Sequence, residues 1–311
     1  MLCSAGRSTV GRRMTVTRVF YSPIYAGSDY EFDTTRKARW IAESLAQSPI
    51  KDLELVEPVP LRAEQLARTH DQKYIDAVRT GEPRELAESQ GFVWDPKLWE
   101  MVLASNGGVV AAAAAAISDG VAGSLSSGLH HARAGRGVGF CTFNGLAIAA
   151  KEALSAGARS VLILDVDAHC GGGTASLIAD DPRIWQVDVS VVGFDCYEST
   201  DRARVDVVTH ALDYLPTIRK RLGQLDAEGL QFDLCIYNAG MDPHEDCSTG
   251  GLRGITTRVL AERERMVFDW CVGRRLPIAF VLAGGYTGMR LDESALVDLH
   301  RMTLERGATA K

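Results

Sequence analysis

Two carboxylates and an imidazole stand at two-residue spacing in the segment Asp165-Val-Asp167-Ala-His169, directly after a short apolar run. On an extended strand end, residues two apart project to the same side, so the three side chains can face one site. Packing carboxylates together is costly unless a cation neutralises them. A strand-end turn with solvated acids is the alternative, but the histidine and the following Gly171-Gly172-Gly173 favour a metal site.

Asp242 is the natural third ligand. It follows Ala239-Gly240, where small residues let the backbone approach a site closely, although a lone aspartate after a strand would usually cap a turn. Two aspartates and one histidine suit zinc, cobalt or ferrous iron better than magnesium. Three protein ligands also leave one coordination position open, as in catalytic metal sites.

Two further segments offer groups for proton transfer and charge stabilisation. His130 and His131 are adjacent in a loop bounded by glycines, and such a pair can supply a general base with an electrostatic partner, although a loop histidine is usually only solvated. Tyr286 follows Gly284-Gly285, so its hydroxyl can reach a developing oxyanion, unless the ring simply belongs to the core.

These residues require a scaffold that brings distant segments together. The chain alternates apolar runs with amphipathic segments, which predicts an α/β fold with a mostly parallel sheet and, because no linker or repeat interrupts it, a single domain. Six strands are expected at 16–21, 56–61 (an edge strand, because it contains prolines), 161–164, 187–192, 234–237 and 278–282. Helices are expected at 35–47, 70–79 and 106–119, the last one buried and rich in alanine.

Three polar clusters follow three of the expected strands. Asp165 to His169 come after the run 161–164, Asp242 comes after 234–237, and Gly284 comes after 278–282. In open α/β sheets, ligands bind in the crevice beyond the carboxyl ends of the strands. We therefore expect the three clusters to converge on one site.

Composition narrows the class of protein. The chain has 311 residues and a formal net charge of −6, which argues against sequence-independent binding of nucleic acid. Seven cysteines form no C-x-x-C pair, which indicates neither a disulfide scaffold nor a thiolate zinc site and suggests a cytoplasmic location. No uninterrupted apolar run reaches the roughly 18 residues that span a bilayer, so no membrane association is expected.

Five motifs along the chain resemble those of a known family. The motifs Leu129-His-His-Ala132, Gly139-Phe-Cys-Thr-Phe-Asn144, Asp165-x-Asp-x-His169, Ala239-Gly-Met-Asp-Pro-His244 and Gly284-Gly-Tyr286 occur in this order. Together they resemble the zinc-dependent histone deacetylase family of the arginase/deacetylase superfamily, which includes bacterial acetylpolyamine amidohydrolases. The resemblance runs from about Tyr21 to Leu299. It implies a three-layer α/β/α fold and one catalytic domain over residues 15–311, with residues 1–14 outside it as a disordered segment or a misplaced start.

The resemblance also implies roles for individual residues. The metal ligands, for Zn²⁺ with Fe²⁺ or Co²⁺ as alternatives, would be Asp167, His169 and Asp242. The catalytic residues would be His130, His131 and Tyr286. A structural monovalent cation such as K⁺ would lie at Asp165 and Ser190. The substrate channel would be lined by Gly139, Phe140, Gly284 and, at its rim, Asp95.

This sequence departs from the family pattern in two places. Gly172 stands where the family has an aspartate that hydrogen-bonds the second tandem histidine, so we expect the basicity and orientation of His131 to differ and leave open which histidine is the base. The stretch 193–232 also lacks the glycine-rich loop that usually forms the opposite channel wall. Phe194 or Tyr197 is a candidate replacement.

The implied activity is hydrolysis of the amide of an N-acylated amine: an acyl-lysine, an acylpolyamine or a small metabolite. One alternative is a catalytically weakened relative that binds acyl-amines or a protein partner. A metallohydrolase of the arginase type is a third reading, which the tandem histidines and Tyr286 disfavour. An oligomer is compatible with the sequence.

Overall fold

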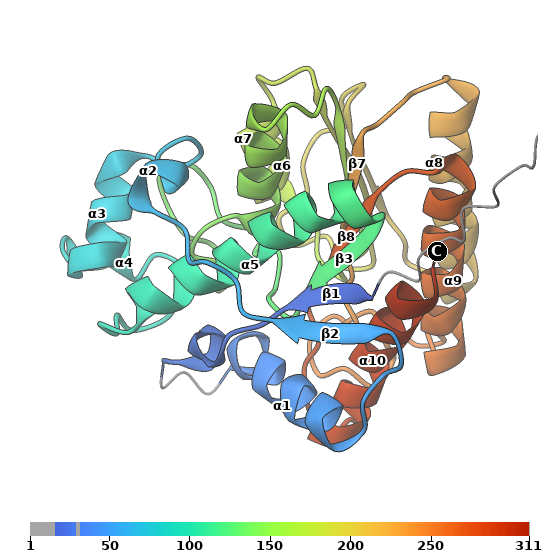
Figure 1. Cartoon of the computed structure of the whole chain (residues 1–311), viewed down its shortest axis with the longest axis horizontal. Coiled ribbons are helices and arrows are strands. Elements are labelled where there is room, and N and C mark those ends of the chain that lie inside the picture. The colour runs from blue at the N-terminus through green and yellow to red at the C-terminus, as the bar shows by residue number, and fades with distance from the viewer. Residues whose placement is uncertain (1–15, 29–31, 311) are drawn as a thin grey trace, which may run out of the picture.

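Eight parallel strands form one sheet in the computed structural model, which describes residues 16–28 and 32–310 (Figure 1). The expectation for residues 1–14 lies outside the described residues. The strand order is β2-β1-β3-β8-β7-β4-β5-β6. The strands are β1 (Thr17–Phe20), β2 (Leu53–Val56), β3 (Val121–Ser124), β4 (Val161–Asp165), β5 (Ile184–Ser190), β6 (Ala203–Val207), β7 (Leu234–Asn238) and β8 (Ile278–Val281).

Helices cover both faces of the sheet, as expected for three α/β/α layers (Figure 1). One apolar core joins the sheet to α1, α8, α9 and α10, and a second joins its other face to α5, α6 and α7. A smaller cluster packs α2 and α3 against the first turns of α5. The helices are η1 (Pro23–Ala26), α1 (Asp33–Gln47), α2 (Ala63–Leu66), α3 (Gln72–Thr80), α4 (Arg84–Ala87), α5 (Leu98–Asp119), α6 (Gly145–Ser155), α7 (Gly172–Ile178), α8 (Ala211–Ala227), α9 (Thr257–Arg274) and α10 (Glu293–Thr309).

Five of the six expected strands are present, with β5 lying over Ile184–Ser190 and so starting three residues before the predicted 187–192. The edge strand predicted at 56–61 lies earlier, over Leu53–Val56, and ends before the prolines, which cannot donate to the ladder. Two strands were not predicted. β3 reads only Val-Ala-Gly-Ser and follows α5 after the single residue Gly120, while β6 is an edge strand and is only partly buried. Short, small-residue or half-exposed strands leave little periodic signal.

Helix α5 starts eight residues before the predicted position 106 and crosses one face of the sheet (Figure 1). Its alanines let it pack closely on the sheet and on α6. By length and composition α5 also meets the test for a membrane span, but 61% of the apolar window is buried inside the molecule. Buried core helices pass the same test, so this finding carries little weight.

The carboxyl ends of β5, β4, β7 and β8 lie side by side in the sheet. The last residue of β4, Asp165, is the register partner of both Asp188 on β5 and Asn238 on β7. Asn238 in turn pairs with Val281 at the end of β8. The predicted convergence of the three polar clusters at one sheet edge is therefore confirmed.

Two buried histidines make the stability of this fold sensitive to acid. The ring of His70 accepts from Asn144 N at 3.0 Å and faces Arg133 O at 2.9 Å, so both nitrogens are satisfied in the neutral form. Burial lowers the pKa of His70 to about 4. Burial and the charge of Lys37 lower the pKa of His300 well below its usual range. Both rings would be neutral in the folded chain at pH 5 and protonated in the unfolded chain.

We predict that the free energy of unfolding falls as the pH is lowered from about 6.5 towards 4, because the unfolded chain then binds more protons than the folded one. His70 alone would contribute on the order of 3 kcal/mol to this loss. Urea unfolding at pH 7 and pH 5 measures it. His70→Gln should flatten the pH dependence, whereas the exposed His210→Gln should not. Equal slopes for both variants would contradict the assignment.

Candidate functional site

Asp167, His169 and Asp242 converge at the ends of β4 and β7. One potential ligand atom from each residue lies within 4.8 Å of the others, and all three side chains are largely shielded from solvent. His169 Nδ1 lies 3.2 Å from Asp167 Oδ1 and 3.1 Å from Asp242 Oδ2. The three residues predicted as metal ligands are thus brought together with their donor atoms facing one point.

The main chain holds the two carboxylates in place. Gly284 N donates to Asp167 Oδ2 at 2.7 Å, and Ala168 N donates to Asp242 Oδ1 at 2.9 Å. The other oxygen of Asp242, Oδ2, is buried and faces His169 Nδ1 at 3.1 Å, but within the described part of the chain it accepts no hydrogen bond of good geometry. A buried carboxylate oxygen in that state needs a cation. Two carboxylates and one imidazole nitrogen around it fit a divalent metal of the zinc type.

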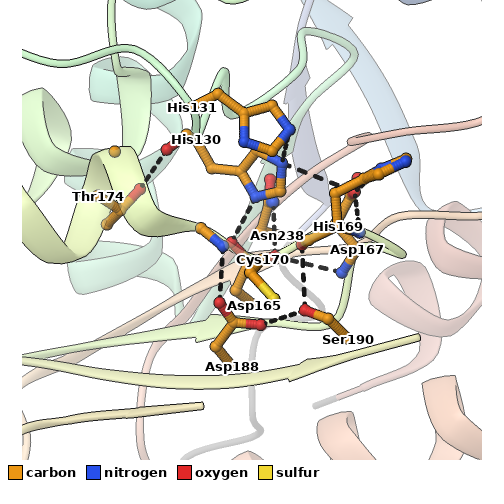
Figure 2. A network of polar contacts seen from close by, with 12 residues as sticks. His130, His131, Asp165, Asp167, His169, Cys170, Thr174, Asp188, Ser190 and Asn238 are labelled. Atoms are coloured by element: carbon orange, nitrogen blue, oxygen red, sulfur yellow. Dashed lines mark hydrogen bonds and ion pairs between the residues drawn. The ribbon is translucent and has the colours of Figure 1, made fainter. Parts of the chain in front are cut away.

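The tandem histidines lie beside these candidate ligands (Figure 2). His130 Nδ1 lies 2.8 Å from Asp165 Oδ2, and its Nε2 lies 3.1 Å from His131 Nε2 and 3.6 Å from Asp167 Oδ1. The His130 carbonyl accepts from Thr174 N at 2.9 Å, which fixes the loop from the side of α7. Asp165 therefore orients the ring of His130.

His131 also has a carboxylate partner, although position 172 is a glycine. Asp195, in the loop after β5, places Oδ2 3.0 Å from His131 Nδ1 and accepts from Gly173 N at 3.0 Å. Arg133 forms an ion pair with its other oxygen. Gly172 cannot supply the carboxylate that orients His131 in the family pattern, and Asp195 supplies it from a different loop. A Cβ at Gly172 would lie 2.2 Å from the Asp195 carbonyl oxygen, so the two arrangements exclude each other.

The two histidines differ in their electrostatic surroundings. Burial would lower the pKa of His130, but the charges of Asp165 and Asp167 outweigh burial and raise this pKa to about 10. Burial and the charge of His130 lower the pKa of His131 to about 4, against the opposing hydrogen bond to Asp195. At neutral pH the pair therefore contains one charged ring, His130, and one neutral ring, His131.

A narrow cavity leads to this centre. It is lined by both tandem histidines and Asp167 and by the following channel and wall residues: Phe32, Thr34, Ser127, Gly139, Phe140, Cys141, Asn238, Ala283, Gly284 and Tyr286. Phe140 is 43% exposed, and its ring lies 4.4 Å from Phe32, whose ring lies 5.5 Å from Tyr286. Burial and the charges of Asp242 and Asp167 hold the pKa of Tyr286 well above its usual range, so the phenol keeps its proton.

Phe194 lies beside this cavity, with its ring 5.0 Å from His131 and 6.2 Å from His169. Of the two residues considered for the opposite channel wall, Phe194 therefore packs against the histidines of the centre, whereas Tyr197 lines a separate pocket with Arg133. Asp95 is not among the cavity-lining residues. Its carboxylate accepts from Lys97 N at 2.8 Å just before α5, so a rim role for Asp95 stays a prediction.

Asp165 and Ser190, expected at a monovalent-cation site, are both buried below the tandem histidines (Figure 2). Ser190 Oγ donates to His169 O at 3.1 Å and bonds Asp188, which accepts from Gly171 N at 2.7 Å. Burial and the charge of Asp165 raise the pKa of Asp188 well above its usual range. Several oxygen atoms that could coordinate a cation therefore lie close together beside buried carboxyl groups. The presence of a monovalent cation at this position stays a prediction.

Lys37 was missed as a member of the site. It lies on α1 within the run Arg36-Lys37-Ala38-Arg39, which resembles a solvated helix face, yet its side chain is buried and donates to Ala283 O. Burial lowers the pKa of Lys37 to about 8 against the charges of the candidate ligand aspartates. The charge of Lys37 thus interacts with Asp167 and Asp242. The residues around Lys37 in the sequence give no sign that its side chain is buried near these carboxylates.

A parallel α/β sheet with an Asp-His-Asp cluster and tandem histidines at its strand ends defines the class of arginase/deacetylase-like proteins. The sequence profile of the histone deacetylase domain matches residues 31–301. The chain belongs to the histone deacetylase family. This membership supports a deacetylase-type amidohydrolase that acts on acylated amines.

Individual relatives agree with this assignment. The chain is 33% identical over 228 residues to an uncharacterised protein of Picosynechococcus, which covers 71% of this chain and 75% of that protein. It is 26% identical to histone deacetylase 2 of Arabidopsis thaliana, over 88% of this chain and 75% of that protein. It is 31% identical to the acetoin utilization protein AcuC of Bacillus subtilis, over 62% and 56%.

Solved structures confirm the fold. The HDA15 HD domain superposes with a TM-score of 0.77 at 20% identity, covering 93% of this chain and 90% of that one. An acetylpolyamine aminohydrolase from Burkholderia pseudomallei superposes with a TM-score of 0.74 at 20% identity, covering 93% and 98%.

Replacing Gly284 with alanine should weaken metal binding. The added Cβ would lie 2.2 Å from Asp242 Oδ2 and 2.5 Å from Asp167 Oδ2, so the ligand carboxylates would have to move apart. We expect the dissociation constant for Zn²⁺ to rise at least about tenfold, measured by competition with a chromophoric chelator. Gly193→Ala is the matched control, because a Cβ there meets nothing within 4 Å. Unchanged zinc affinity in Gly284→Ala would show that the carboxylates are not the ligands.

Proposed function

We propose that this chain is a zinc-dependent amidohydrolase that removes the acyl group from an N-acylated amine. The observation that carries the proposal is a cavity lined by Asp167, the histidine pair and the Tyr286 phenol, with His169 and Asp242 clustered around Asp167 at its base. Each histidine of that pair has its own carboxylate partner. These are the parts that amide hydrolysis requires: a metal, a base and a donor to the oxyanion.

When bound, the metal would act as a Lewis acid and lower the pKa of a coordinated water to about 7, with Fe²⁺ or Co²⁺ as alternatives to Zn²⁺. Asp167, His169 and Asp242 would hold it. In the proposed reaction, His131 is the general base, because its Nε2 is unprotonated at neutral pH and Asp195 fixes its Nδ1–H. His130 stays charged beside it and stabilises the negative charge that develops.

Tyr286 and the histidines share the later steps. The protonated Tyr286 phenol donates a hydrogen bond to the carbonyl oxygen as the tetrahedral intermediate forms. His131, having accepted the proton from water, returns it to the leaving amine nitrogen, so the base becomes the acid. The aromatic walls formed by Phe140 and Phe194 exclude water and accept an extended, apolar acyl-amine stem.

The substrate would be an acyl-lysine, an acylpolyamine or a small acylated metabolite. A single catalytic domain over residues 15–311 would bind it. The weakened, binding-only alternative rested on the missing carboxylate at position 172. Asp195 removes that support, because His131 keeps a carboxylate partner.

Purified protein should release acetate from a panel of acetyl-lysine peptides and acetylpolyamines, lose this activity to a chelator and regain it with Zn²⁺.

Tyr286→Phe should lower kcat by roughly 10²- to 10³-fold with a smaller effect on KM, because the lost hydrogen bond acts on the oxyanion. Tyr21→Phe, a half-buried tyrosine outside the cavity, is the control. Bound metal without turnover of any acylated amine would instead favour a binding function.

Asp195→Asn should lower kcat by about 10- to 100-fold, because the amide orients His131 less well and no longer raises its basicity. The hydrogen bond to Asp195 raises the pKa of His131, so its removal should also move the acid limb of the kcat/KM profile to lower pH. Asparagine tolerates the left-handed backbone of Asp195 (φ 57°), which separates the lost charge from strain.

The exposed Asp201→Asn lies in the same segment and should leave both kcat and the profile unchanged. Restoring the family's aspartate by Gly172→Asp should lower activity, because its Cβ would collide with the Asp195 main chain. Higher activity in Gly172→Asp would show that Asp195 is not the working partner of His131.

A further inference from the structure

A fully buried ionic cluster lies under the loops that carry the candidate metal ligands. Its centre is Arg263 of α9, which is 0% exposed, and its other members are Glu264, Tyr214 and Tyr237. Arg263 Nε and Nη2 donate to Glu264 Oε1 at 2.9 and 2.7 Å, and Tyr237 Oη donates to the same oxygen at 2.7 Å. None of these side chains takes part in the proposed reaction.

The remaining donor atom of Arg263 reaches main-chain carbonyls on two different loops. Nη1 donates to Gly240 O at 2.6 Å and to Val166 O at 3.4 Å. Val166 directly precedes Asp167, and Gly240 stands two residues before Asp242. One guanidinium therefore spans the end of β4 and the end of β7 beside the candidate ligands.

These contacts begin where the β-ladder stops. The last register pair of β4 and β7 is Asp165 with Asn238. Beyond it, Val166 N still donates to Asn238 O at 3.3 Å, and Tyr214 Oη donates to Val166 O at 3.3 Å while it accepts from Arg263 at 3.1 Å. Past the ladder, the two loops are joined directly by the Ala168 N–Asp242 Oδ1 bond and are bridged by side chains of α8 and α9.

A buried ion pair is a costly way to fill this space. Both charges lose their hydration, and apolar residues of similar volume are often at least as stable. Glu264 is adjacent to Arg263 on α9, so the ion pair itself joins no two elements. What an apolar residue could not supply is the planar set of donors that binds carbonyls on two loops at once.

We propose that Arg263 is a positioning residue for the metal centre. It sets the separation of the β4 and β7 loops, so that Asp167, His169 and Asp242 converge before a metal binds. Glu264 neutralises and orients the guanidinium, and Tyr214 extends its reach to Val166 O. This inference rests on the proposed metal-dependent function.

Arg263→Met preserves much of the side-chain volume and removes both carbonyl contacts. We expect the Zn²⁺ dissociation constant to rise about 10- to 100-fold, as it does when residues that orient metal ligands are lost. The absorption spectrum of the Co²⁺-loaded variant should shift, because the ligand geometry relaxes. kcat should fall more than KM changes. Arg263→Lys, with one compact ammonium group, should restore only part of the affinity.

Val267→Ala is the matched control. Val267 is fully buried on the same helix one turn later, so its truncation should lower the free energy of unfolding without touching either carbonyl. If Val267→Ala lowers stability and keeps zinc affinity while Arg263→Met loses zinc affinity, the effect of Arg263 is positional and not general destabilisation.

Tyr214→Phe gives an independent test if Arg263→Met does not fold. It removes one hydroxyl from the cluster and should weaken zinc binding in the same direction by a smaller factor. Zinc affinity within twofold of wild type in Arg263→Lys and Tyr214→Phe, or in a folded Arg263→Met, would overturn the proposal. Failure of the wild-type chain to bind any divalent metal would overturn the proposed function as well, so the two failures can be told apart.

Discussion

Burial of negative charge is the constraint on which the rest of this structure depends. Asp165, Asp167, Asp188 and Asp242 lie buried at neighbouring strand ends, where a charged carboxylate loses its hydration at considerable cost. The chain offsets this with main-chain N–H groups, with the charged His130 and Lys37, and with a place for a cation. A parallel sheet suits this arrangement, because its strand ends open together at one edge.

Glycine makes this crowding of charged groups sterically feasible. At Gly240 and Gly284 a side chain would press on the ligand carboxylates, and at Gly173 it would meet the main chain of His131. These positions are closed to other residues by contacts from elsewhere in the chain and not by local backbone conformation, since none of the three has a positive φ. The glycine-rich character of the strand ends is thus a packing requirement of the site.

The sequence predicted the parts of this site that are encoded locally. Strand ends, glycine runs and the D-x-D-x-H spacing each lie within a few residues, so the convergence of the ligands followed from the fold class. Asp195 could not be found in this way, because it reads as an ordinary turn residue and meets His131 across 64 positions. Lys37 and Arg263 stand in charged helical runs that resemble solvated faces, and only tertiary packing shows that they are buried.

The loop after β5 carries two different duties on adjacent residues. Phe194 packs against the ring of His131 beside the cavity, and Asp195 orients the same ring. In the family pattern, the aspartate that orients the second histidine stands at the position of Gly172, in the loop that carries His169. There the channel wall can change in sequence without changing the partner of the histidine. In this chain, a change of the loop after β5 that fits a different acyl-amine would also change the residue that holds His131. A change in this one short loop would therefore alter both the surface beside the cavity and the carboxylate that holds His131.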